Sequence, residues 1–496
     1  MSLDHTFLAI ILYFLSTISF LGAQSHDSLP RKSSSHTNHL PQNLTTSSVM
    51  NGPPKVAVRT MAEWEEVEYL LVSWTQYPNT LREIVRYARE VCKVLIICGD
   101  SVSVKAFLVA GRVRTKGVSF IHAYPNSVWI RDYGPQSVYM NEVDSLALVD
   151  WIYNRARVRD DQLSEIIATH TSLKLFTTTQ SPYELINIGG NFLTDGMGTA
   201  FSSQLVLREN KLEGLYSSSS KNEAEIDRIM QTYMGIERYL KMPMLPYDRI
   251  HHIDMHLKLL DEETLLIGQY PEGVADGPHI ERNFQELLAN EYSSFGSPYR
   301  VIRIPMPSHE GFYPDAKWVN YRTYTNAVLI NRLVLVPQYE CSEDSLALEV
   351  YRNALPGYKI IGVDVSQLIQ SGGALHCVTQ TIGVRDPLRI IHQPIRAFFP
   401  ETSHAKISAM LAHVSGISQA RVFYKTTENP VFSPADMQQV DPFKGIWEAY
   451  IPLPHSPDQL LYYIEATSYS GKIQRRPMSA PKGYWRVRVG GDVDRR

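Results

Sequence analysis

Between about Val56 and Ile395 the chain alternates between two patterns of apolar residues. Short continuous apolar runs such as Tyr69–Trp74 and Val94–Cys98 are typical of buried strands. Between them, Thr80–Val91 places its apolar residues at helical spacing, which predicts a helix with one buried side. The same spacing predicts further helices over Val102–Val113, Asp161–Thr169, Asn222–Met234, Asn283–Tyr292 and Asp344–Asn353.

Two ranges of this region, Met255–Gly268 and Thr325–Pro337, show the pattern of paired strands and predict hairpins. We therefore predict an α/β domain over 56–395 with much antiparallel pairing. After a boundary near Gln393–Ser403 the sequence pattern changes to short predicted strands, in which apolar and polar residues alternate, separated by Pro and Gly turns. A linker over 396–413 and a small immunoglobulin-like β-sandwich over 414–490 are expected there.

The N-terminal part is predicted to be a targeting segment. Phe7–Gly22 is an apolar run that ends near Ala23, which is typical of a signal peptide over 1–23. An uncleaved membrane anchor is the alternative, although the run is short for a full span. The polar stretch 24–55 is expected to be a disordered linker. It contains Asn43 in an Asn-Leu-Thr glycosylation sequon, so we expect a secreted glycoprotein.

Composition narrows the class of protein. The chain has 496 residues, 44% of them hydrophobic and 20% charged, with a formal net charge of −3. This is typical of a soluble globular protein of two to four domains, and nothing in it indicates a nucleic acid or an anionic membrane as partner. Four cysteines are too few for a disulfide scaffold, and Cys92 and Cys98 flank a predicted buried strand.

The candidate chemistry begins at the run Gly-Gly-Ala-Leu-His-Cys, which spans 372–377. A pair of glycines permits a sharp turn or a close backbone approach, and Cys377 then precedes a strand-prone segment. Cys377 is therefore a candidate nucleophile, with a buried core cysteine as the alternative interpretation. An unperturbed thiol is mostly protonated at neutral pH, so other groups must activate it.

Polar residues recur at intervals of roughly sixty residues along the α/β region. They are Asp132, Asn191, His252, Asn326 and Cys377. This recurrence suggests one structural unit that is repeated, each copy presenting a polar side chain at the same end.

His252, Asp254 and His256 would share one face if this segment were a strand. They could be metal ligands, they could face an organic substrate, or they could lie on a solvated face. A cysteine, a histidine and two carboxylates suit attack on a guanidinium, which is planar, cationic and rich in N–H donors. Two aspartates would bind it, the thiolate would add to its central carbon, and histidine would protonate the departing ammonia.

The motifs Trp-Ile-Arg-Asp-Tyr-Gly-Pro, Gly-Gly-Asn, His-Ile-Asp and Gly-Gly-Ala-Leu-His-Cys occur in this order. From about Val56 onward the chain resembles the Porphyromonas-type peptidylarginine deiminases, which are related to the agmatine deiminases. The resemblance implies a five-bladed α/β propeller with pseudo-fivefold symmetry (pentein-like), followed by an immunoglobulin-like domain. It also implies catalysis without a cofactor or a metal, in contrast to the calcium-dependent vertebrate enzymes.

The resemblance further implies a role for single residues, carried over by motif. Cys377 matches the nucleophile, His252 the general acid/base, Asp132 and Asp254 the guanidinium-binding carboxylates, and Asn326 a polar residue near the nucleophile. Trp129 matches an aromatic residue that packs on the substrate, and Ile250 is expected to line the substrate as well. Arg155 and Arg157 resemble paired arginines that hold the carboxylate of a C-terminal arginine. A solvated arginine pair is the alternative.

The leading hypothesis is a secreted peptidylarginine deiminase that converts C-terminal arginine of peptides or proteins to citrulline and ammonia. Agmatine deimination to N-carbamoylputrescine is the second hypothesis, because the Arg-Asp-Tyr-Gly-Pro form is closer to agmatine deiminases. A metal-dependent hydrolase and a non-catalytic binding module remain as hypotheses from other classes.

Overall fold

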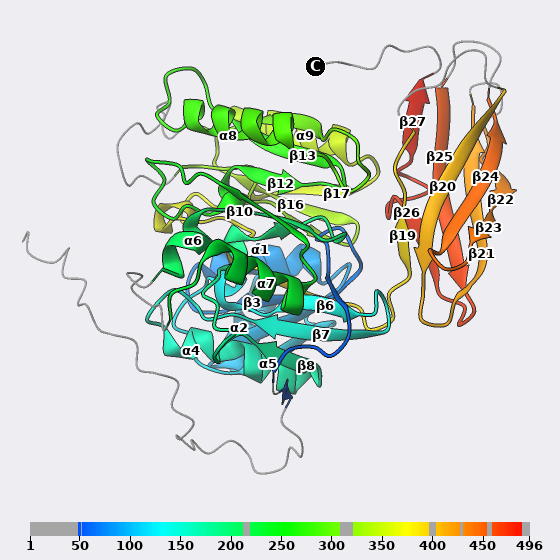
Figure 1. Ribbon diagram of the computed structural model, residues 1–496. Helices are drawn as coiled ribbons and strands as arrows, with labels where there is room; N and C mark the ends of the chain where they lie inside the picture. The colour runs from blue at the N-terminus through cyan, green and yellow to red at the C-terminus, as the bar shows by residue number, and fades with distance from the viewer. Residues whose placement is uncertain are drawn as a thin grey trace, which may run out of the picture. The chain divides into compact units, whose positions relative to one another are not determined.

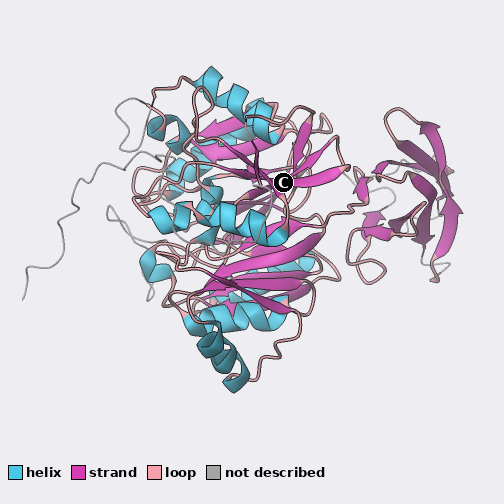
Figure 2. Ribbon diagram, turned by 90° about the horizontal axis from the view of Figure 1, so that it is seen from below, coloured by secondary structure: helices cyan, strands magenta, loops and turns pink. Residues whose placement is uncertain are grey.

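The computed structural model describes residues 48–50, 52–211, 219–307, 321–395, 403–426, 430–453 and 459–488. The described residues between 48 and 388 form an α/β part, and those from 389 onward form a β part (Figure 1). In Figure 2 the helices of the described chain all belong to the α/β part. The predicted signal peptide, most of the predicted linker over 24–55 and Asn43 lie outside the described residues. Among the described residues, no helix has the length and apolar character that a membrane crossing requires.

One arrangement recurs five times in the described α/β part: an antiparallel strand pair, a helix, and a third strand parallel to the second. The first repeat consists of β18 (Gln380–Gly383), β3 (Val67–Ser73), α1 (Pro78–Ala88) and β4 (Lys93–Cys98), and the second of β6 (Gln136–Met140), β7 (Ser145–Asp150), α5 (Leu163–Thr171) and β8 (Lys174–Thr177). The third consists of β9 (Leu193–Thr194), β10 (Thr199–Ser203), α7 (Glu223–Met234) and β11 (Arg238–Met242), and the fourth of β12 (Leu257–Leu259), β13 (Thr264–Gln269), α8 (Gly277–Asn290) and β14 (Arg300–Pro305). The fifth consists of β15 (Val328–Ile330), β16 (Leu333–Gln338), α9 (Glu343–Ala354) and β17 (Lys359–Asp364). The roughly sixty-residue recurrence in the sequence reflects this repeated unit.

Shorter elements extend or connect the repeats. They are β1 (Val49–Met50), β2 (Val58–Thr60), α2 (Ser101–Ala110), β5 (Val118–His122), α3 (Ile130–Tyr133), α4 (Val158–Asp161), η1 (Gly189–Asn191), α6 (Leu205–Glu209), η2 (Ile253–Met255) and η3 (Ile369–Ser371). β1 pairs with β8, so the predicted linker over 24–55 ends in a strand.

The repeat explains how distant polar residues come together. Each repeat's first strand is preceded, within a few residues, by one of the recurring polar groups. Asp132 precedes β6, Asn191 precedes β9, His252 precedes β12, Asn326 precedes β15 and Cys377 precedes β18. β18 pairs antiparallel with β3, so the last of these segments joins the first part of the domain. The helices cover the strands with one apolar side, as α1 does with Leu81, Ile84, Val85 and Ala88.

The C-terminal part consists of two antiparallel sheets around one apolar core. One sheet contains β19 (Arg389–Ile391), β20 (His404–Ala412), β24 (Ile446–Pro452) and β23 (Gln438–Asp441). The other contains β22 (Ser433–Asp436), β21 (Ile417–Lys425), β25 (Gln459–Ser468), β26 (Ile473–Arg476) and β27 (Trp485–Arg488).

The predicted boundary of this part is misplaced. Within the range 396–413, expected to be a linker, His404–Ala412 forms β20, which pairs with both β19 and β24. β19 precedes the predicted boundary and nevertheless belongs to the β part. The alternation of burial along β20 shows the period of two that marks a half-buried strand.

Candidate active site

The two glycines before Cys377 have different functions. Gly372 has φ +95°, a left-handed conformation that favours glycine, and it ends η3. A Cβ on Gly373 would lie 2.6 Å from Cζ3 of Trp129 and 2.9 Å from Cys377 Sγ. One glycine therefore makes the turn, and the other lets Trp129 lie close to the thiol.

Asn326 fixes the segment that carries Cys377. Its side-chain oxygen accepts from the backbone N–H of His376 at 3.0 Å and from that of Cys377 at 3.4 Å. Its amide group donates to Cys377 Sγ at 3.3 Å. Because a hydrogen bond to sulfur stabilises the thiolate more than the thiol, this contact favours the reactive form.

His252 and Asp254 lie at the start of the fourth repeat. Asp254 Oδ2 lies 2.8 Å from His376 Nδ1 and 3.9 Å from Cys377 Sγ. The expectation that His252 and Asp254 share a strand face is wrong, since His252 caps η2 and Asp254 lies within it. Asn191 supports this turn, because its side-chain oxygen accepts from the backbone N–H of Ile253 at 3.2 Å.

Asp132 enters the site on α3. The backbone N–H of the preceding residue, Arg131, donates to the carbonyl of Cys377 at 3.2 Å, which holds the two segments together. A Cβ on Gly190 would lie 2.6 Å from His252 Nδ1, 3.0 Å from Asp132 Oδ1 and 3.3 Å from Asp254 Oδ2. Three polar atoms therefore converge above a glycine that has no side chain to fill the space between them.

Several polar atoms of these three side chains have no hydrogen-bond partner within the described structure. They are Asp132 Oδ1, Asp254 Oδ1 and both ring nitrogens of His252, and all are buried. Buried polar groups are almost always paired in folded proteins, so an unpaired set at one place indicates a binding site. Two carboxylates and an imidazole are the partners that a planar cation with several N–H donors requires.

Burial sets the protonation of the site. It raises the pKa of Asp132 to about 7, although Arg155 and Arg157 oppose the shift. Burial also raises the pKa of Asp254 well above its usual range, and burial together with both carboxylates raises the pKa of Cys377. The pKa of His252 falls to about 3 because of burial and the nearby charge of Arg155. The site without a substrate therefore favours uncharged side chains, and a bound cation would favour the ionised carboxylates and the thiolate.

The residues expected to select the substrate lie around this centre. Trp129 is half-buried beside Cys377, and Ile250 is half-buried against the main core. Arg155 and Arg157 are partly exposed and lie in electrostatic range of Asp132. The segment that carries them bends and is not extended, and Arg157 caps α4.

A metal site built from His252, Asp254 and His256 has no support in the geometry. His256 lies against Phe284 of α8, with ring centroids 6.1 Å apart. In the described ranges, no group of three or more His, Cys, Asp or Glu side chains is arranged to hold a metal ion. The strand alternation that suggested these ligands is replaced by the turn η2.

Sequence reasoning missed the buried charges behind the site. His376, Glu63, Lys258 and Arg131 lie next to or behind the predicted residues, and Lys258 Nζ pairs with Glu63 Oε2 at 2.6 Å. His376 and Arg131 adjoin Cys377 and Asp132 in sequence, which is the only signal for them. Glu63 and Lys258 lie 195 residues apart and show no pattern that links them.

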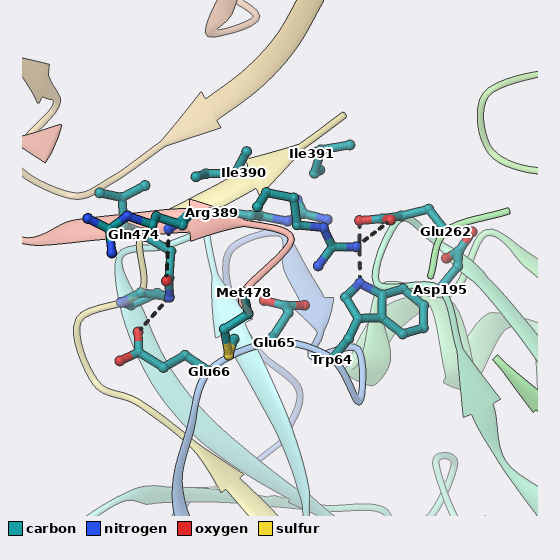
Figure 3. Close-up of a pocket in the computed structure, with 14 residues that line it drawn as sticks. Trp64, Glu65, Glu66, Asp195, Glu262, Arg389, Ile390, Ile391, Gln474 and Met478 are labelled. Atoms are coloured by element: carbon teal, nitrogen blue, oxygen red, sulfur yellow. Dashed lines mark hydrogen bonds and ion pairs between the residues drawn. The ribbon is translucent and has the colours of Figure 1, made fainter. Parts of the chain in front are cut away.

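A second pocket, drawn in Figure 3, is separate from this centre. It is lined by Trp64, Glu65, Glu262 and Arg476 among others, and by none of the residues predicted for the active site. Arg476 pairs with Glu262 Oε2 at 2.8 Å, and Trp64 Nε1 donates to Glu262 Oε1 at 3.4 Å. These groups bind one another, so the pocket is a structural network of charges.

Comparison with known proteins agrees with the geometry. The sequence model of the Porphyromonas-type peptidyl-arginine deiminase family matches residues 59–382. The chain belongs to this family. The deiminase is thus a hydrolase that acts on C–N bonds of guanidino groups.

Relatives and structures of similar fold cover the α/β part. The deiminase is 27% identical to a protein of Legionella pneumophila (strain Paris) that carries the name agmatine deiminase, over 67% of this chain and 97% of that protein. A crystal structure from Porphyromonas gingivalis, titled as an arginine deiminase, has a TM-score of 0.57 at 22% identity and covers 66% of this chain and 98% of that one. The agmatine deiminase of C. jejuni has a TM-score of 0.54 at 22% identity and covers 66% and 97%. The α/β part thus has the mixed α/β fold of these deiminases.

The raised pKa of Asp132 generates a prediction about stability. In the unfolded chain this carboxyl ionises near its ordinary pKa of 3.8, whereas in the folded protein it stays protonated up to about pH 7. The free energy of unfolding therefore decreases as pH rises between these values, by on the order of 4 kcal/mol for about three pKa units. Asp132→Asn cannot ionise and should be more stable than the parent at about pH 8, with no such gain near pH 4.

Urea unfolding of both proteins at the two pH values measures this difference. The same variant should lose on the order of a hundredfold or more in kcat/KM, because half of the guanidinium's charged partners are gone. If the difference in stability between Asp132→Asn and the parent is the same at both pH values, the result would contradict the burial of Asp132.

Proposed function

We propose that this protein is a secreted, cysteine-dependent peptidylarginine deiminase that prefers arginine at the C-terminus of peptides or proteins. It would produce peptidyl citrulline and ammonia through a covalent amidino intermediate on Cys377. The placement of Arg155 and Arg157 within electrostatic range of Asp132 carries this proposal. A C-terminal arginine has a carboxylate as well as a guanidinium, and paired guanidinium groups bind carboxylates well.

Agmatine deimination is the alternative, and the names of several relatives favour it. Agmatine has no carboxylate and would offer neither arginine an ionic partner. It follows that the two substrates make opposite demands on this pair, which makes the pair the decisive feature to test.

The geometry supports a defined order of steps. The substrate guanidinium lies between Asp132 and Asp254, and its charge favours their ionised forms. Cys377 Sγ adds to the central carbon, and Asn326 stabilises the sulfur through its amide donor at 3.3 Å. His252 takes up the thiol proton and delivers it to the departing nitrogen, so the C–N bond breaks and ammonia leaves.

The second half reverses these roles. His252 removes a proton from water, whose oxygen adds to the amidino carbon. The C–S bond breaks, the thiol is restored, and the carbon retains the oxygen as a ureido group. One guanidinium and one water thus yield one ureido group and one ammonium ion. The product is uncharged, so the buried carboxylates regain protons and no longer hold it.

We also propose that the five repeats form the five blades of a propeller with the catalytic residues at its axis. The recurrence of one pairing pattern supports this arrangement, because each repeat presents its polar residue at the same end of its first strand. The two antiparallel sheets of the C-terminal part support an immunoglobulin-like sandwich.

The nucleophile is tested first. Cys377→Ser should reduce turnover of all guanidino substrates by about a thousandfold or more, since a serine hydroxyl is a much weaker nucleophile at neutral pH. Unfolding of the variant should match the parent. The matched control is Cys341→Ser, a half-buried cysteine outside the site. Retained turnover in Cys377→Ser, or equal loss in Cys341→Ser, would remove Cys377 from its role.

The substrate class is tested with four compounds: a C-terminal-Arg peptide, its C-terminal amide, free arginine and agmatine. Replacing Arg155 and Arg157 by alanine should weaken the C-terminal-Arg peptide by about 2 kcal/mol, or about thirtyfold in kcat/KM. We use the lower end of the range for charged pairs because both arginines are partly exposed. Agmatine and the amidated peptide should change by less than about threefold.

Arg159→Ala is the matched control, since this arginine is exposed and lies on the same segment. An equal fall for all four compounds would show that Arg155 and Arg157 are structural. If agmatine is the better substrate of the parent protein, the peptidyl proposal is wrong.

Secretion is proposed from the apolar run Phe7–Gly22 and the sequon at Asn43. Expressed in a eukaryotic host, the protein should be recovered from the medium, begin near Gln24, and lose mass on treatment with an endoglycosidase. An asparagine-to-glutamine change at Asn43 should abolish that loss of mass. Retention of the whole chain in membranes would favour the anchor alternative.

A further inference from the structure

Directly behind the catalytic residues lies a buried polar cluster, defined here as His376, Glu63, Lys258 and Arg131. His376 Nδ1 lies 2.8 Å from Asp254 Oδ2, and both side chains are 2% exposed. The other ring nitrogen, Nε2, lies 3.5 Å from Glu63 Oε1, and Glu63 in turn pairs with Lys258. His376 therefore lies between a catalytic carboxylate and a second carboxylate that is already neutralised.

Each member of the cluster is fixed by further contacts. The backbone N–H of His376 donates to the side chain of Asn326 at 3.0 Å, and its carbonyl accepts from Arg131 Nε at 3.3 Å. Glu63 Oε1 also accepts from the backbone N–H of Leu329 at 3.3 Å. The backbone of His376 is therefore held on both sides, and its ring lies 2.8 Å from Asp254 Oδ2.

The segment that carries Glu63 is also anchored. The next residue, Trp64, donates to Glu262 (Figure 3). Glu65 pairs with Arg59 at 2.5 Å and accepts from the backbone N–H of Ala62 at 2.8 Å. Glu63 is thus presented to Lys258 from a turn that its neighbours hold in place.

We propose that His376, held through its backbone by Asn326 and Arg131, is a positioning residue that orients the Asp254 carboxylate for the substrate guanidinium. Around a bound cation Asp254 is ionised, and two acceptors cannot share a hydrogen bond, so Nδ1 must then carry the proton. This bond holds Oδ2, the oxygen that lies with His252 Nδ1 and Asp132 Oδ1 above Gly190, while Oδ1 is buried without a hydrogen-bond partner. The role deepens the proposed function and rests on it, since it concerns how the same site binds its cation.

The charges that face His376 agree with this role. Asp254 comes from η2, Lys258 from β12, Arg131 from α3 and Glu63 from the segment before β3. Burial, with Arg131 and Lys258, lowers the pKa of His376 well below its usual value. A neutral ring with its proton on Nδ1 can still donate to Asp254. Removing this donor should raise the pKa of Asp254 and move the acid limb of kcat/KM to higher pH.

Two amide variants separate positioning from packing. In His376→Asn the amide nitrogen stands two bonds from Cβ, as Nδ1 does, so it can donate to Asp254. In His376→Gln it stands three bonds from Cβ, as Nε2 does, and so faces Glu63. His376→Leu removes both nitrogens at similar volume. All three are made in the full chain and assayed by product formation from the guanidino substrate that the parent protein turns over best.

We expect His376→Asn to retain kcat/KM within about threefold. His376→Gln and His376→Leu should lose about tenfold or more, mainly in KM, with the acid limb moved up by about one pH unit. In a Cys377→Ser background, His376→Gln should weaken the cationic substrate by about tenfold and the uncharged ureido product by less than about threefold. A structural defect would weaken both ligands alike.

The outcomes are distinct. Equal loss in the Asn and Gln variants, or an unmoved acid limb in His376→Gln, overturns the positioning role. If the Leu variant fails to fold, the Asn and Gln pair still decides. A parent protein that turns over none of the guanidino compounds overturns the proposed function itself. Binding of a C-terminal-Arg peptide, compared between the Asn and Gln variants, then still tests the orientation of Asp254.

Discussion

The chemistry of this site depends on the burial of two carboxyl groups away from solvent. Burial raises the pKa of Asp132 to about 7 and that of Asp254 well above its usual range, so ionising either group without a partner is costly. A guanidinium that fits between them reverses this balance, because it supplies a cation and N–H donors together. Binding and activation of Cys377 are therefore coupled, since the same charge also favours the thiolate. The uncharged product reverses the effect and is released.

The repeated fold makes such a site possible without a long buried loop. Each contributing side chain lies on a short turn just before the first strand of its repeat, and the two asparagines serve those turns. Asn191 accepts from Ile253 N–H beneath Asp254, and Asn326 accepts from the N–H groups of His376 and Cys377. Side-chain amides thus satisfy backbone donors that no strand can pair at these positions. Precise placement of the reactive groups follows from satisfying the backbone.

Local patterns in the sequence predicted the positions of helices well, but they predicted less well which segments are strands and which are turns. Helical spacing located α1 and α7 to within a few residues, and the recurrence of polar residues indicated the repeat. Alternation failed at His252 and Asp254, because a strand and a tight turn can carry the same short pattern of apolar and polar residues. The boundary near β19 and β20 was also misplaced, although the residues of β20 alternate with the period of a half-buried strand. Glu63 and Lys258 could not be found, since an ion pair between residues 195 apart leaves no periodicity in the sequence.

On the proposed function, the choice of substrate and the chemical step are linked through Arg155. This arginine contributes to the low pKa of His252, after burial, and so disfavours the protonated ring that must hand a proton to the leaving ammonia. On the proposed function, the carboxylate of a C-terminal arginine pairs with Arg155 and offsets part of that repulsion. Protonation of His252 then becomes easier at the moment when it is needed, while the guanidinium keeps Asp132 ionised.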